Sequence, residues 1–76
     1  MSDDPHLIVH KRRSPRGPMY FIRLQRQGDL ITEIWTLDRG RCQHYMTKAS
    51  ASRRVRSLPS LPYLKRGEHI RVEKAP

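Results

Sequence analysis

The chemically versatile side chains of this 76-residue sequence do not form a recognisable catalytic or metal-binding motif. One residue separates Cys42 from His44, and the charges of Arg39 and Arg41 would lower the pKa of a neighbouring thiol. No third member of a nucleophilic triad accompanies this pair. Metal binding needs several ligands at fixed spacing, and the other histidines fall on separate predicted elements. These histidines are His6, His10 and His69. We therefore predict no catalytic residue, no metal and no cofactor.

Two further kinds of enzyme site also lack support. The four glycines are scattered at positions 17, 28, 40 and 67, so they form no glycine-rich phosphate loop. The seven acidic residues stand mostly in predicted turns or near the termini, which leaves no carboxylate pair for acid–base work. A domain of this size buries only about 60% of its unfolded surface. A cleft that encloses a substrate would be hard to build, and we predict that the chain is not an enzyme.

Positive charge is the strongest signal in the composition. Sixteen Lys and Arg face seven Asp and Glu, which gives a formal net charge of +9, and arginines outnumber lysines twelve to four. Between Lys11 and Arg66, fourteen basic residues meet three acidic ones, an excess of eleven. Guanidinium groups pair bidentately with phosphates and carboxylates. We predict binding to nucleic acid, DNA rather than RNA, or to an acidic host protein; a generic basic surface is the remaining interpretation.

The sequence predicts an α+β fold, with a three-stranded antiparallel sheet packed on one helix and a short C-terminal strand. Stretches rich in β-branched and aromatic residues predict strands over 6–12, 19–26 and 30–37. Prolines and a glycine interrupt the chain between the first two strands, and Gly28 can take the positive φ of a turn before the third. The last strand is predicted over 68–73.

A single helix is predicted over residues 48–58. Thr47 is its expected N-cap, and Pro59 ends it. The apolar stripe of the helix consists of Ala51, Val55 and Leu58. We predict one domain over residues 6–73, with a disordered tail at 1–5 and a frayed end at 74–76.

Strand alternation assigns a face to each side chain. The side chains predicted to face the helix are Leu7, Val9, Tyr20, Ile22 and Leu24. The opposite, open face would then carry His10, Arg12, Phe21, Arg23, Gln25 and Trp35. This aromatic and basic face would suit stacking on bases and contacts with guanine edges. A one-residue change of register would exchange the faces, so core positions for Phe21 and Trp35 remain the alternative.

The candidate nucleic-acid-binding residues combine cations in the loops and on the helix with two side chains on the sheet. They are Lys11, Arg12, Arg13, Arg16, Arg23, Trp35, Arg39, Arg41, Lys48, Arg53, Arg54 and Arg56. The loop and helix cations are expected to contact phosphates. Arg23 and Trp35 are expected to affect sequence or strand preference.

The order of features from Gly17 to Leu58 resembles two known families. A glycine-led loop precedes the aromatic strand 19–24, a turn glycine follows, and Tyr45-Met46-Thr47-Lys48-Ala49-Ser50-Ala51 opens the helix. This pattern is similar to the YegP-like bacterial domains and to the arm-binding N-terminal domains of phage and transposon tyrosine recombinases. The first resemblance implies a fold. The second implies DNA binding through a three-stranded sheet in the major groove, with Arg23 and Trp35 as the nearest equivalents of sheet contacts.

The resemblance covers about half of the chain and has departures. The loop 38–44 is longer and more basic than either pattern, and the segment after Pro59 is an addition. We therefore predict a small phage or mobile-element DNA-binding protein. The alternative is a phage-type inhibitor or adaptor that binds a host protein or nucleoprotein complex. The apolar connector 58–64 would then be either its anchor or part of an ordinary small core.

The location and the remaining partners follow from composition. A lone Cys42 allows no internal disulfide and favours a reducing compartment. No apolar run approaches the roughly 20 residues that span a bilayer, and the first residues are acidic rather than basic like a signal peptide. We predict a cytoplasmic protein with no membrane partner. Its short edge strands would allow a homodimer through sheet extension.

Overall fold

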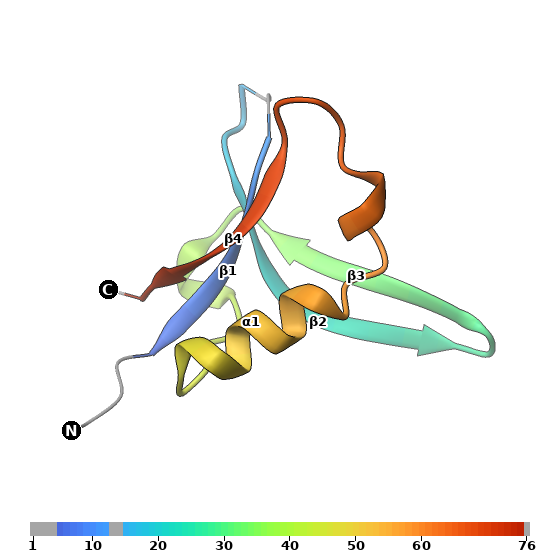
Figure 1. The fold of residues 1–76 in the computed structure, drawn as a ribbon, viewed down its shortest axis with the longest axis horizontal. Coiled ribbons are helices and arrows are strands. Elements are labelled where there is room, and N and C mark those ends of the chain that lie inside the picture. Colours follow the sequence, from blue (N-terminus) through green and yellow to red (C-terminus); the bar gives the residue numbers. More distant parts are fainter. Residues whose placement is uncertain (1–4, 13–14, 76) are drawn as a thin grey trace.

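The fold is a four-stranded antiparallel sheet with one α-helix on one of its faces (Figure 1). A computed structural model describes residues 5–12 and 15–75, so the predictions for residues 1–4, 13–14 and 76 lie outside it. The elements are β1 (His6–Lys11), β2 (Met19–Gln27), β3 (Leu30–Thr36), the 3-10 turn η1 (Arg39–Arg41), α1 (Lys48–Arg56), the 3-10 turn η2 (Leu61–Tyr63) and β4 (His69–Lys74). The predicted α+β class is confirmed.

The sheet has four strands rather than three because the C-terminal strand joins it. The strand order is β3-β2-β1-β4, and β4 pairs with β1 from His6 opposite Lys74 to Lys11 opposite His69. The pairing continues into the end of the chain, where the N–H of Ala75 donates to the carbonyl of Pro5 at 2.8 Å. Ala75 is 7% exposed. The prediction of a frayed end is therefore wrong for Lys74 and Ala75.

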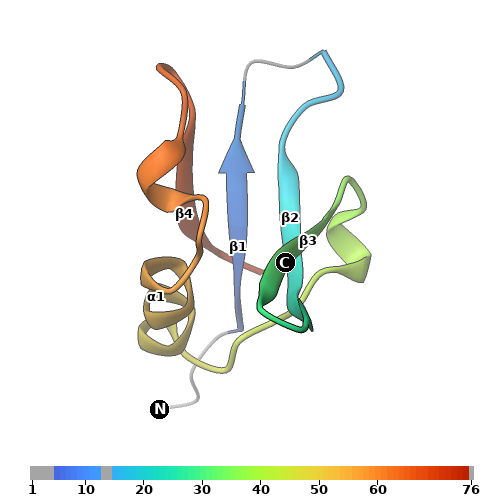
Figure 2. The same cartoon turned by 90° about the vertical axis from the view of Figure 1, so that its right-hand side faces the viewer.

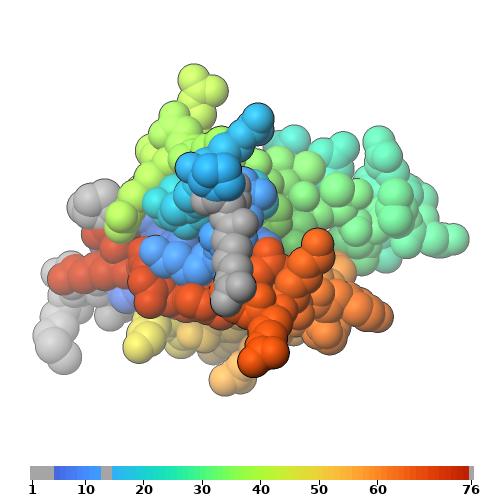
Figure 3. Space-filling model, turned by 90° about the horizontal axis from the view of Figure 1, so that it is seen from above, coloured from blue at the N-terminus to red at the C-terminus, as the bar shows by residue number. Residues whose placement is uncertain are grey.

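Strands β2 and β3 form a hairpin, and the end of the hairpin that carries the turn extends beyond the core. Gln27 pairs with Leu30 across a two-residue turn, in which Gly28 takes a φ of 60° as predicted. Glycine at the first position of such a turn suits the twist of the two strands. Figure 3 shows this end projecting away from the rest of the molecule. Leu30 and Ile31 there are 63% and 43% exposed.

A β-bulge in β2 changes which side chains share a face. Phe21 pairs with Trp35, but the next pair is Arg23 with Ile34, so Ile22 is the extra residue. An extra residue shifts the alternation by one position. Leu24 therefore shares a face with Phe21, and Arg23 lies on the opposite face. At the bulge, the carbonyl of Phe21 accepts a hydrogen bond from the N–H of Gln43 at 3.0 Å, which brings the segment before α1 next to β2.

The predicted faces of β1 and of the start of β2 are wrong, and the predicted open face does not exist. The main core cluster consists of Ile8, Phe21, Ala51 and Leu58, with Trp35 packed against it. The face of Phe21 and Trp35 is therefore the face that α1 covers, as the alternative register predicted.

Leu7 and Val9 lie on the other face of the sheet. They form a second cluster with Ala75, against which Tyr20 and Cys42 pack. Residues 7–9 are all buried. Because both faces of β1 are covered, alternation along β1 carries no information on its orientation.

Helix α1 follows the prediction closely at its start. The Thr47 hydroxyl accepts a hydrogen bond from the N–H of Ser50 at 3.1 Å, which confirms the N-cap. The apolar stripe also faces the core, with Ala51 fully buried, Leu58 2% exposed and Val55 half-buried. The helix ends at Arg56, two residues earlier than predicted, and Leu58 reaches the core from the turn that follows.

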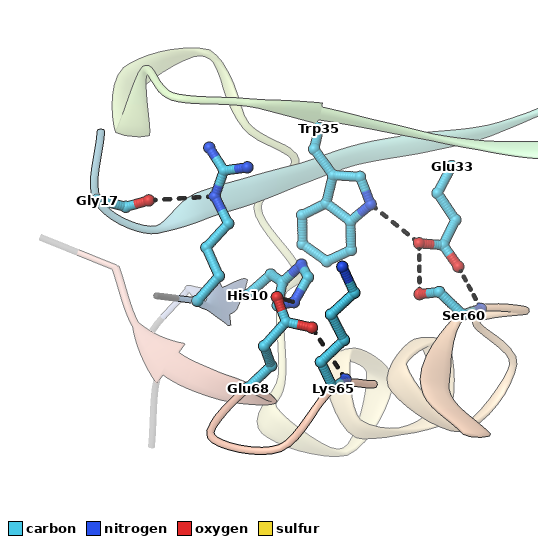
Figure 4. A network of polar contacts seen from close by, with 8 residues as sticks. His10, Gly17, Glu33, Trp35, Ser60, Lys65 and Glu68 are labelled. Carbon is cyan, nitrogen blue, oxygen red and sulfur yellow. Dashed lines mark hydrogen bonds and ion pairs between the residues drawn. The ribbon is translucent and has the colours of Figure 1, made fainter. Parts of the chain in front are cut away.

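The connector between α1 and β4 is attached to the hairpin by one carboxylate (Figure 4). Glu33 Oε1 accepts hydrogen bonds from the Trp35 indole N–H at 3.0 Å and from the Ser60 hydroxyl at 2.7 Å. Glu33 Oε2 accepts from the Ser60 backbone N–H at 2.7 Å. Because Trp35 packs on the core, these bonds tie the connector, the edge strand β3 and the core together. Tyr63, further along the connector, is 82% exposed.

Candidate nucleic-acid interface

Helix α1 carries the densest group of cations in the chain. Four of its nine residues are basic and none is acidic. They are Lys48, Arg53, Arg54 and Arg56, and all four side chains are exposed. The helix packs against β1 and β4 through its apolar stripe, so these cations surround the stripe and point to solvent. The four helix residues predicted to contact phosphate therefore share one element and one surface.

One side of α1 borders a shallow groove next to β2. Arg23 and Arg54 line it together with Tyr45 and Gln43, in a volume of about 320 Å³. Burial raises the pKa of the Tyr45 hydroxyl above its ordinary value of 10.0, although the charge and the hydrogen bond of Arg54 oppose this shift. Tyr45 is therefore a neutral hydrogen-bonding partner at neutral pH. The bulge and the pairing of residues 43–45 with neighbouring strands bring Arg23 to this groove.

The other side of α1 borders a groove next to the edge strand β4. Lys48 and Arg56 from the helix and Arg71 from β4 line it, over an apolar floor that includes Val55 and Val72. Its volume is about 330 Å³. Sequence reasoning missed Arg71, because the final strand was not placed beside the helix. Ile70 and Val72 pack on the α1 side of the sheet, so alternation turns the Arg71 side chain to the opposite face, where its guanidinium donates to Glu73.

Carboxylates do not neutralise the helix. Among residues 5–12 and 15–75, no ion pair joins an acidic side chain to a cation of α1. The Glu33 carboxylate accepts hydrogen bonds from Trp35 and Ser60 instead. Glu73 lies 2.5 Å from the guanidinium of Arg71 and 3.7 Å from Lys11. The positive potential of α1 therefore remains available to an external anion.

The predicted cations of η1 form a separate group on the other face of the sheet. Figure 2 shows η1 and α1 on opposite sides of β1 and β2. The Arg41 Nε lies 3.3 Å from Asp38 Oδ2. Arg39 donates to the carbonyl of Lys74 at 3.2 Å, and its guanidinium stands 5.9 Å from the centre of the Tyr20 ring. Arg39 and Arg41 cannot belong to one continuous surface with α1.

The predicted cations around the β1–β2 loop form a third group. Arg12 Nε donates to the carbonyl of Gly17 at 3.3 Å, and Lys11 is the residue that faces Glu73. Arg16 lies exposed in the turn. Arg13 lies outside the described residues. The structure therefore divides the twelve predicted residues into several places rather than one patch.

Trp35 does not lie on an exposed sheet face. Its ring packs against Phe21 at a centroid distance of 5.3 Å and against His10 at 5.5 Å. In Figure 4, the Lys65 side chain points toward the rings of Trp35 and His10. The indole N–H is already used by Glu33. Stacking on a base would need an open ring face, so the role predicted for Trp35 in strand preference has no geometric support. Arg23 contributes only to the groove that it shares with Arg54.

The remaining reactive groups do not converge. Burial raises the pKa of the Cys42 thiol above its ordinary value of 9.0, which outweighs the opposing effects of its backbone hydrogen bond and of the Arg39 charge. The His10 Nε2 is buried without a hydrogen-bond partner among the described residues, and Glu68 Oε2 lies 3.8 Å from it. In that part of the chain, no cluster of three or more His, Cys, Asp or Glu side chains could hold a metal ion.

Comparison with known proteins does not identify the chain. No family model, curated protein or solved structure matches it. The resemblance to the YegP-like and recombinase arm-binding domains therefore stays a prediction. None of the helices in residues 5–12 and 15–75 is both long and apolar enough to cross a membrane.

Proposed function

We propose that this chain is a non-enzymatic nucleic-acid-binding domain, with DNA as its main ligand and the outer surface of α1 as its main contact. The observation that carries this proposal is that, within residues 5–12 and 15–75, no acidic side chain forms an ion pair with the four cations of α1, a helix that has no acidic residue of its own. Neighbouring cations without acidic partners repel one another, and an external polyanion relieves that repulsion. Arg23 borders the groove on one side of the helix.

Salt dependence is the first test. Lysines and arginines that contact phosphates release counterions, and the slope of log K against log salt changes by about 0.9 per phosphate contact. Anisotropy titrations of the protein with a labelled random-sequence duplex, repeated over a range of salt concentrations, should give a slope of several units. Binding that disappears at physiological salt would contradict the proposal.

A matched pair of triple variants tests the position of the interface. The helix variant carries Arg53→Gln, Arg54→Gln and Arg56→Gln. The control carries Arg26→Gln, Lys65→Gln and Arg66→Gln, which removes the same charge from exposed positions outside α1. The helix variant should lose about three units of salt slope, and the control should lose much less. Equal losses would mean that the net charge acts diffusely and that α1 is not the contact.

A protein partner is the second candidate function, and one apolar surface favours it. Ile31, Pro59 and Tyr63 border a shallow depression of about 470 Å³ between the hairpin and the connector. Leu58 is part of the core, so the anchor predicted within residues 58–64 reduces to the exposed Tyr63. Exposed tyrosines are common energetic centres of protein interfaces. A phage-type inhibitor or adaptor would bind its host protein or nucleoprotein complex here.

The single variant Tyr63→Ser separates the two candidate functions. It should leave duplex affinity unchanged if α1 is the contact. If Tyr63→Ser instead weakens duplex binding as much as the helix variant does, the division between the two surfaces is wrong.

A cytoplasmic location, an origin in a phage or mobile element, and a homodimer through β3 or β4 belong to the same proposal. Sedimentation of the purified protein tests the dimer.

A further inference from the structure

The orientation of α1 on the sheet places one arginine farthest from the core. Ala51 is fully buried and faces the sheet. At 3.6 residues per turn, Arg53 is rotated by about 200° from Ala51, so it points almost directly away from the core. Arg54 and Lys48 are rotated toward opposite flanks of the helix.

The surface around Arg53 is consistent with this placement. Arg53 borders two separate depressions, one with Lys48, Ala49 and Arg56, the other with Tyr45, Ser50 and Arg54. It therefore stands on the ridge between them. On the preceding turn its neighbours are Ala49 and Ser50, which are short, and on the following turn its neighbour is Arg56. The short side chains of the preceding turn let the wall of a groove come close to the helix backbone there.

The flanks of the ridge are both positive. Arg23 and Arg54 line the groove on one side, and Lys48 and Arg56 line the groove on the other. The major groove of B-form DNA is about 12 Å wide and admits one α-helix, whose diameter is about 10–12 Å. The phosphates of the two strands border that groove. A helix with one projecting arginine and cations on both flanks matches this arrangement of charge.

On the basis of the proposed nucleic-acid function, we propose that α1 enters the major groove of duplex DNA, with Arg53 directed at a guanine and the flanking cations on the phosphates of the two strands. An arginine donates two hydrogen bonds to the O6 and N7 atoms of guanine, the commonest specific contact in that groove. The sheet supports the helix from behind and makes no base contact, unlike the sheet-mediated binding that the sequence predicts.

The test uses duplexes enriched from a random pool by in vitro selection with the unmodified protein. The best selected duplex is made twice, with guanine and with 7-deazaguanine, which replaces N7 by C–H and leaves the charge and the minor groove unchanged. The protein should bind the 7-deazaguanine duplex several-fold more weakly, because it loses one of the two bonds of a bidentate contact that together give about 5- to 150-fold discrimination. Arg53→Gln should bind both duplexes equally.

Arg54→Gln is the matched control, because it removes the same charge from the flank of the same helix. It should weaken binding to both duplexes alike, keep the preference for guanine, and lower the salt slope by about one unit. An RNA duplex of the same sequence should bind more weakly than the DNA duplex, because its major groove is too deep and narrow for side chains to read.

The possible results separate this inference from the proposed function. Salt-dependent duplex binding with no effect of 7-deazaguanine, or with an effect that persists in Arg53→Gln, would overturn the role of Arg53 and leave DNA binding intact. A selection that yields no preferred sequence would do the same. Failure to bind any nucleic acid at physiological salt would overturn both proposals.

Discussion

Replacement of Glu33 by alanine should destabilise the domain more than any other loss of a single charge on the hairpin. Its carboxylate accepts three hydrogen bonds, from the Trp35 indole at 3.0 Å and from the Ser60 backbone and hydroxyl at 2.7 Å each. Glu33→Ala leaves two N–H donors in a partly buried place. The Ser60 hydroxyl can turn to water, so its loss adds little.

The magnitude follows from those two donors. A buried donor without a partner costs about 1–3 kcal/mol, and partial access to water reduces this value, so we expect a loss of about 2–4 kcal/mol. A domain of this size has a total free energy of unfolding of roughly 4–11 kcal/mol. In a domain of 60–100 residues, each kcal/mol shifts Tm by about 4–8 °C. The variant should therefore melt roughly 10–30 °C lower than the unmodified protein.

Thermal unfolding followed by circular dichroism measures this effect, with Asp29→Ala as the control. Asp29 lies exposed in the hairpin turn, so its replacement changes the net charge equally without removing the anchor of the connector. The fluorescence of Trp35, the single tryptophan, should also change in Glu33→Ala and not in the control. Equal melting temperatures for the two variants would show that Glu33 does not hold the connector.

Two further predictions concern the core and the pH dependence of stability. Phe21→Ala should cost about 3–5 kcal/mol, whereas Leu30→Ala at the exposed end of the hairpin should stay within about 0.5 kcal/mol; similar losses in urea unfolding would contradict the assignment of the core. Burial tends to raise the pKa of Glu73, but the hydrogen bond and charge of Arg71 and the charge of Lys11 outweigh it, so the folded-state pKa lies below the ordinary 4.5. The stabilisation from Glu73 should therefore be complete above pH 4.5 and disappear as the pH falls through the folded-state pKa, so the stability difference between the unmodified protein and Glu73→Gln should vanish in acid. A difference that persists unchanged at low pH would contradict this sign.

Local signals in the sequence were sufficient to predict the strands, the helix and the N-cap of the helix. The prolines and the glycine between the first two strands, the turn at Gly28 and the N-cap at Thr47 act through neighbouring residues alone, and the structure confirms each predicted strand and the helix within a few residues. Composition also indicated the positive charge, which no fold can change. The family resemblance and the function still await a test.

The faces of the sheet depended on contacts between distant residues. An extra residue at Ile22 reverses the alternation in β2, and no local signal marks it, because its cause includes the bond from Gln43 to the carbonyl of Phe21. Both faces of β1 are buried, so its run of apolar residues has no polar side to orient it.

Only the tertiary structure decided which cations act together. The sequence places Arg23 and Arg54 on different elements, and the packing of α1 on the sheet brings both to one groove. The register of β4 puts the Arg71 side chain on the opposite face, beside Glu73. The same packing puts Arg39 and Arg41 behind the sheet. Charge is a property of each residue and can be counted along the chain. An electrostatic surface depends instead on distances in space, and here the pairing of β4 with β1 and the bulge in β2 determine those distances.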